Sequence, residues 1–146
     1  MLFKTFMAGL ALATLAAGSA VAAECSLPAE AQAGKAVSNQ CKSCHVFDAN
    51  KPSLPAAPNI HDIFGDKAGT RKDFPGYSEG MQGATAKGLV WTEANLIEYI
   101  GDPKAFLSKI NGVDVKHKMF FSLKDEQKRK DVVAFLKAIK GKPECN

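Results

Sequence analysis

Cys41-Lys42-Ser43-Cys44-His45 is the stretch of this 146-residue chain on which its organisation depends. Two thiols separated by two residues, with a histidine directly after the second, form the attachment signature of a c-type haem. Each cysteine can form a thioether with one haem vinyl group, and the imidazole of His45 is then held close to the iron as its proximal ligand. The motif therefore predicts one covalently bound haem c.

Two other kinds of site also use a Cys-x-x-Cys pair. A zinc site needs four protein ligands, usually with a second Cys or His pair, and no such pair stands elsewhere in the sequence. A thioredoxin-like redox pair is expected beside a βαβ pattern in a reducing compartment. Neither feature is present, so haem is the preferred interpretation.

Residues 1–23 are typical of a secretory signal peptide. This segment carries one charge, Lys4, followed by an apolar run and the small residues Val21-Ala22-Ala23. An uncleaved membrane anchor is disfavoured because the run is rich in Ala, Gly and Ser rather than Leu and Ile. A lipoprotein is disfavoured because Glu24 precedes Cys25. We expect cleavage before Glu24, leaving 24–146 as one domain in the periplasm with no stable membrane insertion.

Four cysteines are present, and the haem motif uses two of them. Cys25 and Cys145 remain, one near each end of the expected mature chain. An exported protein rarely leaves two free thiols, so we predict a disulfide between them.

Charge is distributed unevenly along the chain. Residues 24–100 contain seven Lys or Arg against nine acids, and residues 101–146 contain eleven against six. Such a gradient can steer an acidic partner during encounter, although a solvated lysine surface explains it equally well. Nucleic acid is not expected as a partner, because the basic residues lack interleaved aromatics.

The helix signals predict a mainly α fold with no strand pattern. A first helix is expected over 28–37, a second over 92–100 after the cap Thr92, and a short third from the Asp102-Pro103 pair to about 107. A last helix is expected to begin with Ser122 and Asp125 or Glu126 and to end before Gly141. Residues 46–88 and 110–121 read as loops. Loops this long are unusual in a compact domain unless a large cofactor fills the centre.

The sixth position of the iron has four candidate ligands on residue chemistry alone: Met81, His61, His117 and Met119. Methionine raises the reduction potential and suits electron transfer, a second histidine lowers it, and an empty site permits ligand binding. Met119 lies in a short loop segment between two predicted helices, from which a thioether could reach the ring face.

The chain resembles the soluble class I cytochromes c of bacterial and mitochondrial type over residues 34–139. The resemblance rests on ordered pieces rather than on one motif. Beyond 41–45 these are Ala57-Pro58-Asn59-Ile60-His61-Asp62-Ile63-Phe64-Gly65, Ala68-Gly69-Thr70, Gly76-Tyr77-Ser78, Trp91 to Tyr99, Asp102-Pro103-Lys104, Lys118-Met119-Phe120-Phe121 and Val133 to Lys137. It implies four to five helices wrapped around one covalent haem, with long loops.

The resemblance also implies roles for single residues. Met119 is expected as the sixth ligand, and the carbonyl of Pro58 as acceptor of the proximal imidazole N–H. Trp91 and Tyr77 are expected to donate hydrogen bonds to a haem propionate, and Tyr99 to lie beside the methionine sulfur. For each aromatic, plain core packing is the alternative.

Further expectations concern the helix crossing and one departure from the family. Gly34 and Phe135 are expected where the first and last helices cross, which would explain a glycine inside a helix. The first helix has Ser38 or Val37 where an aromatic often faces the last helix. Asp66 stands where the family has an arginine near a propionate, and Arg71 is a candidate replacement.

The function implied is single-electron transfer in the periplasm by a monomer, with His45/Met119 ligation and no enzymatic activity. Redox proteins, acidic ones included, are expected to dock at the haem edge near Lys42, Lys116, Lys118 and Lys124. The alternatives are a haem protein with a labile sixth ligand, of gas-binding or peroxidase-like kind, and a dedicated electron-transfer subunit of a periplasmic dehydrogenase.

Overall fold

The computed structural model describes residues 24–145, so the expected signal peptide lies outside the described residues. Their elements are α1 (Ala29–Val37), the 3₁₀ turn η1 (Ser38–Gln40), α2 (Glu79–Ala86), α3 (Glu93–Gly101), α4 (Pro103–Asn111) and α5 (Glu126–Ile139). The β structure within this part of the chain consists of one isolated antiparallel bridge between Lys67 and Val90. The predicted mainly α class, with four to five helices, is confirmed.

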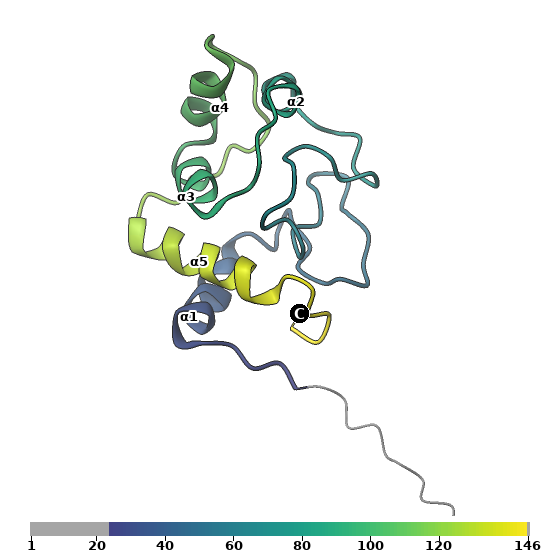
Figure 1. Ribbon diagram of the computed structural model, residues 1–146, viewed down its shortest axis with the longest axis vertical. Coiled ribbons are helices and arrows are strands. Elements are labelled where there is room, and N and C mark those ends of the chain that lie inside the picture. The colour runs from purple at the N-terminus through teal and green to yellow at the C-terminus, as the bar shows by residue number, and fades with distance from the viewer. Residues whose placement is uncertain (1–23, 146) are drawn as a thin grey trace, which may run out of the picture.

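The crossing of α1 and α5 is the most extensive helix contact, and α3 packs on both α5 and α4 (Figure 1). An ideal Cβ on Gly34 would lie 1.9 Å from the backbone oxygen of Asp131 and 2.9 Å from the Cβ of Phe135. The two helices therefore touch backbone to backbone at Gly34, as predicted. Phe135 stacks at 5.8 Å on Phe47, which supplies an aromatic contact that the first helix lacks.

Three of the predicted helices start at side-chain caps. Thr92, Asp102 and Asp125 each accept a hydrogen bond from a backbone N–H in the first turn of α3, α4 and α5 respectively. Asp125 rather than Ser122 caps the last helix. Gly112, in the left-handed conformation, ends α4 four residues beyond the predicted end.

The prediction of loops throughout 46–88 is wrong at α2. Ser78 caps this helix by accepting from the N–H of Met81, and α2 packs on α4. Gly80 and Gly83 weaken its intrinsic helix propensity, but both lie against other parts of the chain. A Cβ on Gly80 would meet Val115 at 2.6 Å, and one on Gly83 would meet the Asn111 side chain at 2.0 Å. Packing, rather than local preference, stabilises this helix.

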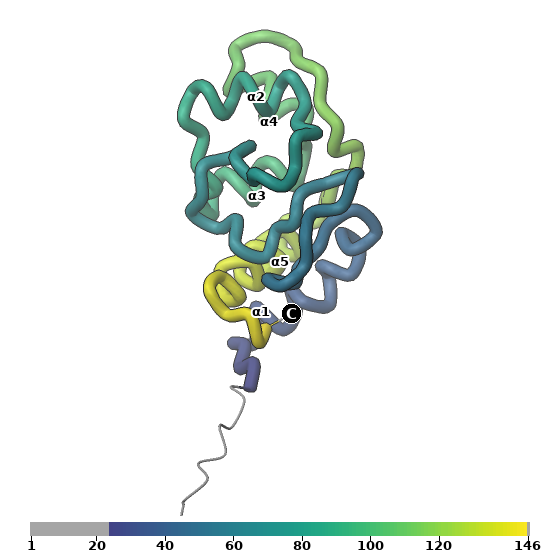
Figure 2. The backbone as a smooth tube through the Cα atoms, turned by 90° about the vertical axis from the view of Figure 1, so that its right-hand side faces the viewer, coloured from purple at the N-terminus to yellow at the C-terminus, as the bar shows by residue number. Residues whose placement is uncertain are grey.

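Residues 46–78 remain without helix and wind along one side of the molecule, as Figure 2 shows in blue to teal. The loop is nevertheless fixed by backbone hydrogen bonds. Ile60 N–H donates to Val46 O (2.8 Å), Gly65 N–H to Trp91 O (2.8 Å) and Trp91 N–H to Asp66 O (2.9 Å). These bonds hold Trp91 and the loop beside each other.

No helix in residues 24–145 combines the length and the apolar character that crossing a membrane requires.

Candidate haem site

A cavity of about 690 Å³ lies between the 46–78 loop, α3, α5 and the segment before α5. Its size falls in the range of small-molecule and cofactor sites. Much of its lining is apolar, including Ile60, Ile63, Leu96, Val132 and Leu136. Cys41, Cys44, His45, Pro58, Tyr77, Trp91, Tyr99 and Met119 also line it, so every residue predicted to contact the haem faces one space.

The Cys-x-x-Cys-His motif forms a tight turn directly after η1. Cys41 N–H donates to Ser38 O (2.9 Å), and the N–H groups of Cys44 and His45 donate to Cys41 O (3.1 and 2.9 Å). This winding places both sulfurs and the imidazole on the cavity wall. Neither Cys41 nor Cys44 takes part in a disulfide, so both sulfurs are available for thioethers.

The His45 ring is oriented by the loop. Its Nδ1 lies 2.8 Å from the carbonyl oxygen of Pro58, to which a protonated Nδ1 donates. That hydrogen bond leaves Nε2 as the nitrogen free for a metal. Burial lowers the pKa of His45, and the hydrogen bond to Pro58 offsets this only in part. The ring is therefore neutral at neutral pH, which is the form that binds iron.

Only two of the four candidates for the sixth position line the cavity, Met81 and Met119. Met81 belongs to the buried hydrophobic cluster and is 6% exposed, so protein atoms surround it. Met119 lies on the extended segment before α5, is only half-buried, and stands outside that cluster. His117 contacts the ring of Phe120 at 5.0 Å in a smaller depression instead.

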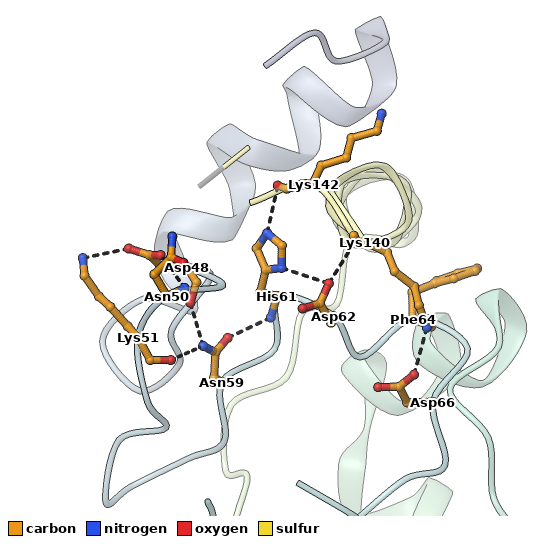
Figure 3. A network of polar contacts seen from close by, with 11 residues as sticks. Asp48, Asn50, Lys51, Asn59, His61, Asp62, Phe64, Asp66, Lys140 and Lys142 are labelled. Carbon is orange, nitrogen blue, oxygen red and sulfur yellow. Dashed lines mark hydrogen bonds and ion pairs between the residues drawn. The ribbon is translucent and has the colours of Figure 1, made fainter. Parts of the chain in front are cut away.

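His61 is the fourth candidate and serves the structure elsewhere. It is 1% exposed, with Nε2 3.2 Å from Lys142 O and Nδ1 3.0 Å from the Asp62 carboxylate, as Figure 3 shows. Asp62 also accepts from the backbone N–H of Gly141 (2.8 Å). His61 therefore packs within the fold and does not line the cavity. The contacts fasten the 46–78 loop to the turn that follows α5.

Cys25 and Cys145 form a disulfide, with Cα atoms 4.9 Å apart, as predicted. It joins the segment before α1 to the turn after α5. Both helices of the central crossing are thereby tied at one end.

An aromatic group forms the wall behind the cavity. Trp91 lies 4.9 Å from Tyr99 and 6.4 Å from Phe106, measured between ring centroids. Burial raises the pKa of Tyr99 far above its usual range, so its hydroxyl remains protonated. Packing is therefore part of the role of Trp91 and Tyr99, and the predicted hydrogen bond of Trp91 and sulfur contact of Tyr99 stay predictions.

Four cationic side chains line the cavity: Lys67, Lys72, Lys118 and Arg71. Arg71 was named as a candidate replacement for the family's arginine near a propionate, whereas Lys67 and Lys72 were not predicted to line the cavity, because no periodicity marks the direction of a loop side chain. Asp66 also lines the cavity, and its carboxylate pairs with Lys140 at 2.8 Å. Two free thiols, an oriented imidazole, a thioether, apolar walls and cations for two propionates fit haem c.

Comparison with known proteins agrees with this chemistry. Cytochrome c2 of Cereibacter sphaeroides is 39% identical over 137 residues, covering 86% of this chain and 94% of that protein. Cytochrome c2 of Rhodospirillum rubrum is 41% identical over 143 residues, covering 94% and 98%. The solved structure of cytochrome c2 from Rhodospirillum centenum matches with a TM-score of 0.70 at 38% identity, covering 75% of this chain and 98% of that one. No family model matches the chain.

Helices wrapped around an apolar cavity, with Cys-x-x-Cys-His in its wall, are thus those of a class I c-type cytochrome. Proteins of this class carry electrons on one covalently attached haem c. Within it, the chain belongs to the cytochrome c2 family.

Proposed function

We propose that this cytochrome carries single electrons between periplasmic redox proteins, with His45 and Met119 as the two axial ligands of the iron. Haem c supplies a one-electron couple between Fe(II) and Fe(III), whose potential a thioether ligand raises. The chain holds both ligands in place and catalyses no change in a substrate. The disulfide between Cys25 and Cys145 supports an oxidising compartment.

The hydrogen bond from His45 to Pro58 carries this proposal. This hydrogen bond fixes the imidazole so that one ring nitrogen is left for the iron. Its acceptor belongs to the 46–78 loop, which backbone hydrogen bonds hold in place. A fixed ligand keeps the geometry of the iron site nearly unchanged between oxidation states. The reorganisation energy of electron transfer is therefore small. Two methionines line the cavity, Met81 and Met119. Met119 is the one that other protein side chains leave incompletely covered.

Ligation is tested by the spectrum of the oxidised protein. Wild type should show a low-spin haem with a sulfur-to-iron charge-transfer band. Met119→Ala should lose the band and become high-spin, or bind an external ligand. Met81→Leu is the matched control, because it removes the other cavity methionine while retaining its apolar volume. The control should keep the band.

Three outcomes would contradict the proposal. If the band disappears in Met81→Leu and persists in Met119→Ala, the ligand is Met81. If the oxidised wild type is high-spin and binds small ligands readily, the protein belongs to the ligand-binding alternative. Slow electron exchange by a six-coordinate wild type would argue against a carrier role even with the expected ligands.

The docking surface is proposed around the cavity. Lys118 lines the cavity and Phe120 beside Met119 is 82% exposed. Lys72 lies on the same wall, whereas Lys124 does not line the cavity. The ammonium of Lys118 donates to Gly76 O (2.7 Å), and that of Lys124 donates to Gly101 O (3.2 Å). Exposed charge around an apolar contact suits an acidic partner, because attraction speeds encounter without requiring a tight complex.

This surface is tested by the salt dependence of electron transfer to an acidic redox protein. Lys72→Gln and Lys118→Gln should each lower the rate at low salt and flatten its salt dependence. Lys128→Gln is the control with the same loss of charge, because Lys128 is an exposed residue of α5 and does not line the cavity. Equal slopes for all three variants would move the docking surface elsewhere.

Export is tested on the protein isolated from its native cell. A mature chain beginning at Glu24, recovered in the periplasmic fraction, is the expected result. An intact N-terminus in the membrane fraction would indicate the anchored alternative.

A further inference from the structure

The peptide group between Pro58 and Asn59 has both of its polar atoms in hydrogen bonds. Its carbonyl oxygen accepts from Nδ1 of His45 (2.8 Å), and its N–H donates to Oγ of Ser53 (2.8 Å). The two bonds lie at opposite ends of one delocalised unit. An acceptor at the N–H makes the carbonyl oxygen more negative. Ser53 therefore strengthens the acceptor of the proximal imidazole, although its own side chain does not line the cavity.

Ser53 is also bonded to the carboxylate of Asp73. The backbone N–H of Ser53 donates to Asp73 Oδ2 (2.7 Å), and the side chain of the same serine makes a second hydrogen bond to the carboxylate. These two bonds are the main reason that the pKa of Asp73 lies below its usual value, so the carboxylate is ionised at neutral pH. Because the serine oxygen accepts from Asn59, its hydroxyl proton is the one that points to Asp73. A hydroxyl that donates to an anion is itself a stronger acceptor.

The three hydrogen bonds have the same direction. His45 donates to the Pro58 carbonyl, the Asn59 N–H donates to the Ser53 hydroxyl, and this hydroxyl donates to the Asp73 carboxylate. In a chain of this kind each bond polarises the next, by about 10–30% per bond. A negative charge at the far end thus increases the electron density on the imidazole at the near end.

The Asn59 side chain keeps this peptide group in place. Asn59 is 5% exposed, and its Nδ2 donates to the carbonyl oxygens of Asp48 (2.8 Å) and Lys51 (2.7 Å). Its Oδ1 accepts from the backbone N–H of His61 (2.9 Å), as Figure 3 shows. With its side chain bonded on both sides, Asn59 cannot turn without breaking three hydrogen bonds. The peptide group that connects His45 to Ser53 therefore has a fixed orientation.

We propose that Ser53 is a positioning residue for the proximal ligand, because it links the imidazole of His45 to the Asp73 carboxylate through the Pro58–Asn59 peptide and thereby lowers the reduction potential. The inference rests on the proposed function in one respect, since it requires His45 to bind the iron. A stronger acceptor at Nδ1–H makes the imidazole a more basic ligand. A more basic ligand stabilises Fe(III) more than Fe(II), so it opposes the rise in potential that a thioether ligand causes.

The charge of Asp73 also has a direct effect that any test must separate from this link. Asp73 lines the cavity, so its carboxylate favours Fe(III) through space as well. Asp73 is exposed, and water and salt weaken that effect. Ser53→Ala separates the two contributions. It removes the hydroxyl and leaves both the charge of Asp73 and its hydrogen bond from the backbone N–H of residue 53.

Two measurements on the holoprotein at pH 7 test the proposal. Proton NMR of the Fe(II) form reports the hydrogen bond of His45 through the chemical shift of its Nδ1–H, and spectroelectrochemistry gives the potential. Ser53→Ala should move the Nδ1–H resonance upfield and shift the Fe(II)/Fe(III) equilibrium toward Fe(II) by about two- to fivefold, since polarisation adds only a fraction to each bond. Ser53→Thr supplies the same hydroxyl and should restore both values.

Asp73→Asn leaves Ser53 in place and should also move the Nδ1–H resonance upfield. Asp48→Asn is the matched control, because it removes a carboxylate charge from the same loop. The Asp48 carboxylate accepts from the N–H of Asn50 (2.9 Å) and pairs with Lys51, and it has no bond to Ser53. The control should leave the Nδ1–H resonance unchanged.

A double-mutant cycle decides between the link and the field of the charge. Asp73→Asn should move the Nδ1–H resonance less in the Ser53→Ala background than in wild type, because the link is already broken there. Equal effects in the two backgrounds, or equal resonances in Asp73→Asn and Asp48→Asn, would overturn the proposal. Failure of the Met119 assignment would appear separately, as absence of the charge-transfer band in wild type. It would leave the comparison of potentials among the Ser53 and Asp73 variants intact.

Discussion

Replacement of Gly34 by alanine tests how closely the two terminal helices approach. An added Cβ would lie 1.9 Å from the backbone oxygen of Asp131, 2.5 Å from its carbonyl carbon and 2.9 Å from the Cβ of Phe135. Relieving such contacts requires α1 and α5 to separate by roughly 1.5 Å, given normal contact distances near 3.5 Å. A backbone obstacle cannot rotate away as a side chain can. The separation would loosen the most extensive helix contact of the molecule.

The expected cost follows from two opposing contributions. Overpacking costs about 1 to 3 kcal/mol, and an immovable backbone places Gly34→Ala at the upper end, about 3 kcal/mol. Alanine in place of glycine favours a helix by about 1 kcal/mol. We therefore expect the free energy of unfolding to fall by about 2 kcal/mol or more. For a domain of this size the melting temperature should fall by roughly 6 to 12 °C.

Guanidinium unfolding of the holoprotein, followed by far-UV circular dichroism and by haem absorbance, measures this change. Ala33→Gly is the matched control, because residue 33 is exposed on the same helix. It should cost about 1 kcal/mol from helix propensity alone. A Gly34→Ala protein as stable as wild type, or more stable, would refute the close approach of α1 and α5.

Two further predictions concern the turn after α5. Replacing Cys25 and Cys145 together by serine should lower stability by about 4 kcal/mol on the chain-entropy model, because the disulfide closes a loop with a sequence separation of 120; denaturant unfolding measures this, and the haem spectrum should be unchanged. Burial by itself raises the pKa of Asp62, but the Gly141 N–H and the His61 ring bring it below its usual value. The stability that the Asp62 carboxylate contributes is thus present above its pKa in the unfolded state. It is lost as pH falls through the pKa in the folded state. Asp62→Asn should accordingly be less stable than wild type at pH 7 and lose less stability between pH 5 and 3; parallel acid-unfolding curves would contradict this.

Helix starts were the most predictable part of the fold, because their signals are local. Thr92, Asp102 and Asp125 are capping residues that can be read directly before an apolar period. The first-helix glycine was also interpretable, since a costly residue inside a helix requires a reason outside it. Local signals fail where stability comes from distant contacts. Helix α2 contains Gly80 and Gly83, and its stability depends on packing against Val115 and Asn111.

The site residues also differ in how far the sequence alone could predict them. Cys41, Cys44 and His45 were predictable from chemistry, because their spacing matches the attachment of one cofactor. Met119 was one of four candidates on residue chemistry, and resemblance to a family selected it and supplied Pro58; the structure places both on the cavity wall. Arg71 was named only as a candidate replacement for the family's arginine, and nothing in the sequence shows where its side chain points. A loop residue has no period, and only the folded chain reveals that its guanidinium lacks a partner.

The contacts of the loop explain how a chain with few regular elements around its cavity can hold the iron ligand still. Pro58, which orients His45, lies three residues before His61. His61 in turn meets the carbonyl of Lys142, in the turn that the disulfide fastens to the start of α1. The segments 58–61 and 142–145 are short, and each is held at both ends by one of these contacts. Little conformational freedom therefore remains between His45 and the disulfide. The crossing of the terminal helices therefore supports the proximal ligand as well as the hydrophobic core, although neither helix donates a hydrogen bond to His45.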